Sequence, residues 1–99
     1  MFLKESDIEV WLKSRIEKLG GMFLKFTSPG NDGVPDRIVI MPGGRIAFVE
    51  LKRPGQKERQ RQAFVQARLR KMGCKVFSAV DGMDRVAGVL SWCEKGGGD

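Results

Sequence analysis

The stretch VPDRIVIMPGGRIAFVELK, residues 34–52, decides the fold of this 99-residue chain. Two runs rich in Ile and Val flank a Pro-Gly-Gly turn at residues 42–44, a pattern that predicts a β-hairpin. If Met41 closes the hairpin opposite Arg45, the numbers of paired residues add up to 86. Asp36 then lies opposite Glu50, and the two carboxylates share one face of the sheet.

The charged residues of the hairpin point to a metal site. Lys52 lies two residues after Glu50, so alternation puts it on the same face. Opposed carboxylates have Cβ atoms roughly 4.5–5.5 Å apart and raise each other's pKa, and a divalent cation between them relieves that repulsion. A register slip of one residue would turn Asp36 to the wrong face, so the hypothesis depends on the register.

A simpler interpretation of these charges is open. Asp36 could only begin a strand, and Glu50 and Lys52 could form a solvated ion pair. However, Ile46 and Phe48 precede Glu50 on its face, and charges that continue an apolar stripe favour a functional site.

Composition limits the chemistry available. The chain has no His and no Tyr, and its two cysteines, Cys74 and Cys93, form no Cys-x-x-Cys motif. Histidine bases, tyrosine nucleophiles and a structural zinc site are therefore not expected, and the cysteines are interpreted as small apolar residues. The oxygen ligands that remain suit Mg²⁺ or Mn²⁺.

Length and patterning predict one α/β domain, residues 1–94, with a flexible tail, residues 95–99. No apolar run is long enough to cross a membrane and no signal-peptide pattern is present, so we expect a cytoplasmic protein that does not act at membranes. At this size, dimerisation would help stability.

The net charge of +6 is unevenly distributed. Half of the 18 basic residues lie between Lys52 and Lys75, against the single acid Glu58. Such a block favours a polyanionic partner such as DNA or RNA, rather than a small-molecule substrate, although a solvated helix face is the ordinary alternative.

The predicted elements alternate in the order α-β-β-β-α-β-α, which indicates a mixed central sheet flanked by helices. We expect helices over 4–19 and 58–72 and a last helix capped by Asp81 or Asp84. Strands are expected over 22–27, 36–41, 45–53 and 74–80. Ser6 and Glu9 fit a capping box for the first helix. The second helix offers four apolar residues for burial: Phe64, Val65, Leu69 and Met72.

Pro35-Asp36 followed by Glu50-Leu51-Lys52 resembles the Pro-Asp…(Asp/Glu)-x-Lys nuclease superfamily, PD-(D/E)xK, whose restriction-endonuclease-like core has the same element order. The chain is most similar to the stand-alone, phage-type members of the virus-type replication-repair nuclease family, VRR-NUC. The resemblance covers nearly the whole chain. It rests on these further segments: Glu5–Glu9, Leu19–Gly21, Lys25–Gly30, Gly33–Arg37, Phe48–Arg53, Gln62 and Gly73.

The resemblance implies roles for individual residues. Asp36, Glu50 and the backbone carbonyl of Leu51 would bind the metal, and Lys52 would orient the attacking water. Glu5 matches a further active-site acid, although without the resemblance it would be interpreted as a helix N-terminal acid favoured by the macrodipole.

Gln62 matches a family glutamine on the second helix, which could contact Lys52 or the scissile strand. Taken by itself, a glutamine on a helix is ordinarily solvated. The expected DNA contacts are six basic residues: Lys25, Arg37, Arg53, Lys57, Arg59 and Arg61.

The expected function is a metal-dependent, structure-selective DNA endonuclease. By resemblance it would act as a homodimer on branched DNA such as four-way (Holliday) junctions, with DNA repair as the expected context. The alternatives are a non-catalytic nucleic-acid-binding module of the same fold and a subunit that docks on another nuclease.

Overall fold

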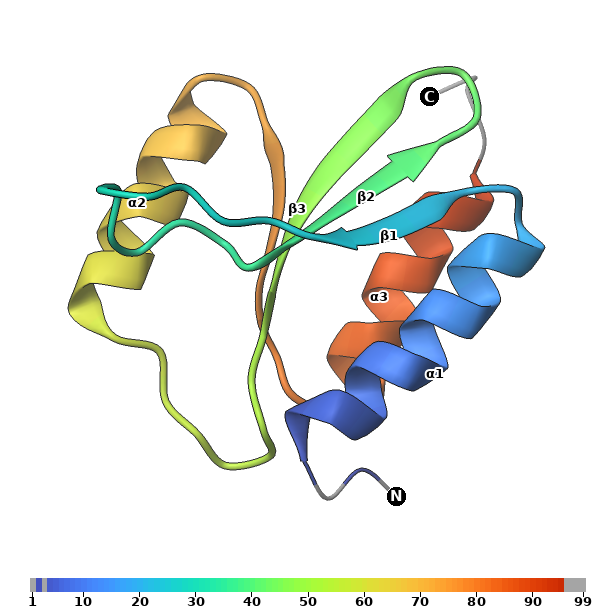
Figure 1. Cartoon of the computed structure of the whole chain (residues 1–99), viewed down its shortest axis with the longest axis horizontal. Coiled ribbons are helices and arrows are strands. Elements are labelled where there is room, and N and C mark those ends of the chain that lie inside the picture. The colour runs from blue at the N-terminus through green and yellow to red at the C-terminus, as the bar shows by residue number, and fades with distance from the viewer. Residues whose placement is uncertain (1, 3, 96–99) are drawn as a thin grey trace.

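A computed structural model describes residue 2 and residues 4–95. The chain forms three helices and a four-stranded sheet (Figure 1). In chain order these elements are α1 (Glu5–Lys18), β1 (Met22–Lys25), β2 (Arg37–Met41), β3 (Arg45–Leu51), α2 (Gln60–Lys71), β4 (Lys75–Val80) and α3 (Met83–Glu94). The predicted order and the mixed α/β class are confirmed.

The strands lie side by side in the order β1-β2-β3-β4. The first three are antiparallel, and β4 runs parallel to β3 after the α2 crossover. Met41 pairs with Arg45 and Arg37 pairs with Val49, so the predicted hairpin register is confirmed. Extending that register by one residue places Asp36 opposite Glu50.

Helices α1 and α3 cover one face of the sheet, on the right of Figure 1. Every second residue of β3 is buried beneath them, namely Ala47, Val49 and Leu51. From α1, the core receives Ile8, Leu12 and Ile16, which recur at helical spacing. Within the described part of the chain, neither these helices nor α2 is long and apolar enough to cross a bilayer.

The opposite face of the sheet is only partly covered, because α2 packs against β4. Strand pairing aligns apolar side chains on this face in two cross-strand rows. One row holds Met22, Ile40 and Ile46, and the other holds Leu24, Ile38 and Phe48. We call these six residues the apolar sheet face; Met22, Leu24 and Ile46 are exposed.

The ends of the helices differ from the sequence expectations. Helix α1 follows Lys4, whose N–H donates to Asp7 at 3.0 Å, so the predicted Ser6–Glu9 capping box is wrong. Helix α3 follows the extended residue Gly82, rather than being capped by Asp81 or Asp84. Both helices therefore begin after a residue, Lys4 or Gly82, whose side chain is not a favoured N-cap acceptor.

Helix α2 buries polar side chains rather than the expected apolar ones. Its fully covered positions are Gln62 and Gln66, whereas Phe64 and Met72 are 54% and 68% exposed. The reason is where α2 packs: its inner face lies over the polar end of the sheet, where Glu50 is also buried.

The two cysteines are free, as expected. Cys93 is buried in the core, and burial raises the pKa of its thiol to about 11. Of the predicted tail, Lys95 is described and residues 96–99 lie outside the described residues.

Candidate active site

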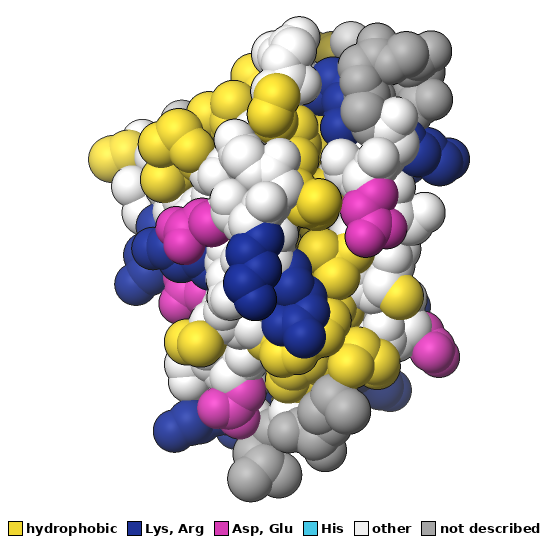
Figure 2. Space-filling view, turned by 90° about the vertical axis from the view of Figure 1, so that its right-hand side faces the viewer, with side chains coloured by type: hydrophobic (Ala, Val, Ile, Leu, Met, Phe, Trp, Pro, Cys, Tyr) yellow, Lys and Arg dark blue, Asp and Glu magenta, His cyan; other side chains and the backbone are white. Residues whose placement is uncertain are grey.

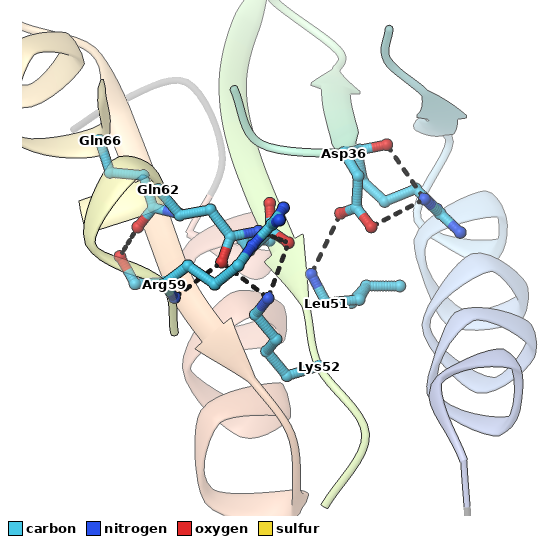
Figure 3. Close-up of polar contacts among 9 residues, drawn as sticks. Asp36, Leu51, Lys52, Arg59, Gln62 and Gln66 are labelled. Atoms are coloured by element: carbon cyan, nitrogen blue, oxygen red, sulfur yellow. Dashed lines mark hydrogen bonds and ion pairs between the residues drawn. The ribbon is translucent and has the colours of Figure 1, made fainter. Parts of the chain in front are cut away.

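Asp36 connects the start of β2 with the end of β3. It directly precedes β2, and its Oδ1 accepts a hydrogen bond from the backbone N–H of Leu51 at 3.1 Å (Figure 3). This bond fixes the carboxylate at the point where the hairpin strands separate. The Leu51 carbonyl, a predicted metal ligand, belongs to the same residue.

Glu50, Lys52 and Gln62 form a buried polar cluster beside it (Figure 3). Lys52 Nζ donates to Gln62 Oε1 at 2.8 Å, and Gln62 Nε2 donates to Glu50 Oε2 at 3.1 Å. Lys52 Nζ and Glu50 Oε2 are 3.6 Å apart. Gln62 therefore bridges the acid and the base through both ends of its amide.

The same amide fixes the start of α2. Gln62 Oε1 also accepts the backbone N–H of Arg59, at 3.1 Å, which satisfies one of the free donors at the helix N-terminus. One side chain thus connects the start of the helix to the polar cluster, and α2 is placed by the cluster as much as by apolar packing.

Burial, together with a neighbouring negative charge, raises the pKa values of Glu50 and Glu5. Burial, followed by the charge of Asp36, raises the pKa of Glu50 to about 7, and Lys52 offsets only part of this effect. Burial and the charge of Asp36 also raise the pKa of Glu5, so α1 brings that residue toward the same site. An additional cation would relieve this repulsion.

The donors fit a hard divalent cation. Glu50 Oε1 is buried and makes no hydrogen bond to any residue that the structure describes, which leaves a carboxylate oxygen free to bind an ion. Among the described residues, no three Asp, Glu or Cys side chains cluster as a ready-made metal site. The predicted donor set of two carboxylates and the Leu51 carbonyl would leave positions for water and phosphate oxygens, as is common for Mg²⁺.

A pocket of about 470 Å³ opens over these carboxylates. Asp36, Glu50 and Gln62 form part of its wall, and the β1–β2 loop forms much of the remainder. The loop is docked on α2, where Arg61 Nε donates to the carbonyl of Asp32 at 3.2 Å. The pocket has room for a phosphate and part of a nucleotide.

Comparison with known proteins places the chain in a family. No family model matches it. It is 47% identical over 75 residues to "Putative nuclease p44" of Acyrthosiphon pisum secondary endosymbiont phage 1, a match that covers 76% of this chain and 81% of that protein. A solved structure described as "VRR_NUC domain" superposes with a TM-score of 0.78 at 34% identity, covering 88% of this chain and 94% of the other.

The chain belongs to the VRR-NUC family of nucleases. A second solved structure, "VRR_NUC domain protein", superposes with a TM-score of 0.67 at 17% identity, covering 98% of this chain and 93% of the other, and supports the fold.

The residues predicted to contact DNA fall into two groups in this VRR-NUC chain. Five of them are exposed, and their role in binding DNA stays a prediction: Lys25, Arg53, Lys57, Arg59 and Arg61. Arg37 is 9% exposed. It is buried and paired with the carboxylates of Glu9 and Asp36, and its role in binding DNA also stays a prediction.

Figure 2 shows the α1–α3 side of the molecule, where basic and acidic side chains are interspersed around apolar ones. That side presents no continuous basic surface among the residues that the structure describes. The clustered basic residues of the sequence belong instead to α2 and the segments that flank it.

Two polar residues between α2 and β4 were not anticipated. Gln66, one turn after Gln62, is completely buried and bonds to Ser78 of β4. Ser78 lies in an irregularity of the β3–β4 pairing, where Ala79 has a φ of 49°. The i, i+4 spacing of the two glutamines was the signal available in the sequence.

Proposed function

We propose that this chain is a divalent-metal-dependent endonuclease that hydrolyses phosphodiester bonds of branched DNA in the cytoplasm of the cell in which it is expressed. The observation that carries the proposal is the cluster of Asp36, Glu50 and Lys52, in which Glu50 and Lys52 are buried and Asp36 lines the pocket above them. In particular, Glu50 Oε2 is ion-paired with Lys52, whereas Oε1 has no partner among the described residues and so has no evident structural role.

The residues divide the chemical work. Asp36, Glu50 and the Leu51 carbonyl would hold Mg²⁺ or Mn²⁺, which supplies Lewis acidity toward the scissile phosphate and a water of lowered pKa. Lys52, held by Gln62 at 2.8 Å, offers a fixed positive charge near the phosphate that becomes more negative during attack. Glu5, a further acid at the site, would act through water.

DNA binding would rest on the exposed cations around the pocket. Arg53, Lys57 and Arg59 lie between β3 and α2 and would contact flanking phosphates. Such contacts give affinity with a strong salt dependence and no base specificity, which suits an enzyme that recognises the shape of DNA.

The apolar sheet face supports a homodimer. Met22 and Ile46 are 52% and 48% exposed, and large exposed apolar surfaces commonly mark protein interfaces. A second copy carries the same self-complementary rows, and a two-fold axis through them would give two active sites for the two cuts that a four-way junction requires.

Cleavage assays test the function directly. Purified protein is incubated with matched four-way-junction, flap and linear duplex substrates, each with Mg²⁺, Mn²⁺ or EDTA. We expect cutting that EDTA abolishes and that is fastest on branched DNA, with paired symmetric cuts in the junction. Tight binding without cleavage in either metal would instead support a non-catalytic binding module.

A further inference from the structure

A part-buried charge bridge connects α1 with the Asp36 peptide. Arg37 Nε donates to Glu9 Oε2 at 2.8 Å. Arg37 Nη1 lies 3.2 Å from Asp36 Oδ2 and donates to the Asp36 carbonyl at 3.0 Å. Arg37 thus connects the first helix to the side chain and the backbone of one catalytic carboxylate.

The bridge completes the orientation of Asp36. Its Oδ1 is held by the N–H of Leu51 and its Oδ2 by Arg37, so the Asp36 carboxylate cannot rotate freely. Each carboxylate oxygen has two acceptor positions, so neither contact by itself excludes a metal ion. The planar fork of Arg37 is suited to this double contact in a way that lysine is not.

Glu9 has a separate electrostatic role. An arginine with a side chain 11% exposed needs a counterion, and Glu9 supplies it at 2.8 Å. Glu9 and Arg37 together carry no net charge, so Arg37 can orient Asp36 without cancelling the charge of the Asp36 carboxylate. Without Glu9, Asp36 is the only carboxylate ion-paired to Arg37 in the described structure, and Arg37 competes with a cation for it.

We infer that Arg37 and Glu9 are a positioning pair for the metal site: Arg37 orients Asp36, and Glu9 neutralises Arg37 so that Asp36 keeps its charge for the metal ion. This inference rests on the proposed function, because it concerns the metal site at Asp36 and Glu50. It assigns to Arg37 a role inside the protein in place of a phosphate contact.

The inference predicts an unusual pattern of metal binding among variants. Glu9→Gln keeps an oxygen that can accept from Arg37 Nε but removes the charge, so Mn²⁺ affinity should fall about five- to tenfold. Glu9→Gln combined with Arg37→Gln restores the charge balance, so affinity should recover at least about threefold from the single variant. The maximal cleavage rate of the double variant should be low, because without Arg37 the Asp36 carboxylate is no longer oriented.

Mn²⁺ binding is measured on metal-free protein by electron paramagnetic resonance of the free ion. The Mg²⁺ dependence of junction cleavage is measured in parallel, to separate half-saturating Mg²⁺ from the maximal rate. Glu17→Gln is the matched control: it removes the same charge from an exposed position of α1, and its affinity should stay within about twofold of the wild type. Thermal melts establish that each variant is folded.

Two results would overturn the inference in distinguishable ways. If the wild type binds Mn²⁺ but Glu9→Gln binds it equally well, or the double variant fails to recover, the pair is structural only and the proposed function stands. If the wild type binds no Mn²⁺ and cleaves no DNA, the metal site fails together with the pair.

Discussion

At the residue scale, Glu50 has the most consequential environment. It is 4% exposed, it faces Asp36, and its pKa rises to about 7. Between the ordinary value of 4.5 and about 7, the folded protein therefore binds a proton at Glu50 that the unfolded chain releases. This group destabilises the metal-free fold above pH 7, and that cost is relieved as the pH falls toward 4.5.

We therefore expect the unfolding free energy of the metal-free wild type to rise from pH 8 to pH 5.5. The rise should be larger than the one that Glu50→Gln shows over the same pH change. The difference should be at most about 2 kcal/mol, because Glu50 takes up its proton over roughly 1.5 pH units between about 7 and 5.5, and each unit is worth ~1.4 kcal/mol. Mg²⁺ should raise the melting temperature more at pH 8 than at pH 5.5. Melts of both proteins at the two pH values measure this, and identical pH profiles would contradict it.

Gln62 combines three contacts in one side chain, because it bonds to Lys52, Glu50 and the N–H of Arg59. We expect Gln62→Ala to lower the unfolding free energy by about 1–3 kcal/mol, because buried partners lose their hydrogen bonds. Cleavage should slow by ~10- to 100-fold, because Lys52 is no longer held in place.

Gln60→Ala, at an exposed position one half-turn earlier in α2, is the control for helix composition and should behave as wild type. The prediction fails if Gln62→Ala is as active and as stable as Gln60→Ala in single-turnover cleavage and urea unfolding.

At the element scale, the β1–β2 loop and α2 act as one unit that forms the wall of the pocket. Gly33 has a φ of +89°, and a Cβ atom there would lie 2.8 Å from both the Cγ and the carbonyl oxygen of Arg61. The close approach of the loop to the helix backbone requires glycine at this position. The position of the loop over Asp36 and Glu50 therefore depends on this contact.

Gly33→Ala should displace the loop from α2 and weaken junction binding several-fold, with a stability loss greater than that of Gly30→Ala. Gly30 has a similar φ of +81°, but a Cβ atom added there would meet nothing within 4 Å, so its variant isolates the backbone strain of about 1–2 kcal/mol. Binding by electrophoretic mobility shift and stability by urea unfolding measure the difference. Equal behaviour of the two variants would show that the close contact is unimportant.

Elements of different kinds were predictable to different degrees. The hairpin register followed from the Pro-Gly-Gly turn and the alternation, because a slip would have exposed Val39 and Val49. The inner face of α2 was not predictable from apolar periodicity, because Gln62 and Gln66 occupy it to serve polar groups on neighbouring strands. Their burial depends on long-range contacts, which local patterns do not encode.

At the scale of the whole molecule, the sheet separates two functions. The side with α1 and α3 holds the apolar core, and the side with α2 holds the polar cluster at one end and the apolar sheet face at the other. The proximity of Asp36, Glu50 and Lys52 could be predicted because these charges lie at the ends of paired strands. The bridge from Glu9 to Arg37 spans 28 residues, and no local signal connected the two.

We expect the apolar sheet face to hold two copies together. Ile46→Glu should shift the protein from dimer to monomer in sedimentation velocity and reduce paired cutting of a junction. Val10→Glu, at a position of α1 that is 68% exposed, introduces the same charge elsewhere and should leave the dimer intact. A wild type that is monomeric at micromolar concentrations would contradict this prediction.

The assignment of the active site is tested most simply by single-turnover cleavage of a four-way junction in Mg²⁺ by Asp36→Asn. DNA binding is measured alongside. Asp32→Asn, an exposed acid at the same pocket, is the control. We predict that Asp36→Asn binds the junction but cuts it at least ~100-fold more slowly, as is typical when a key electrostatic group is lost, while Asp32→Asn cuts at close to the wild-type rate. Wild-type cleavage by Asp36→Asn would contradict the assignment of the active site.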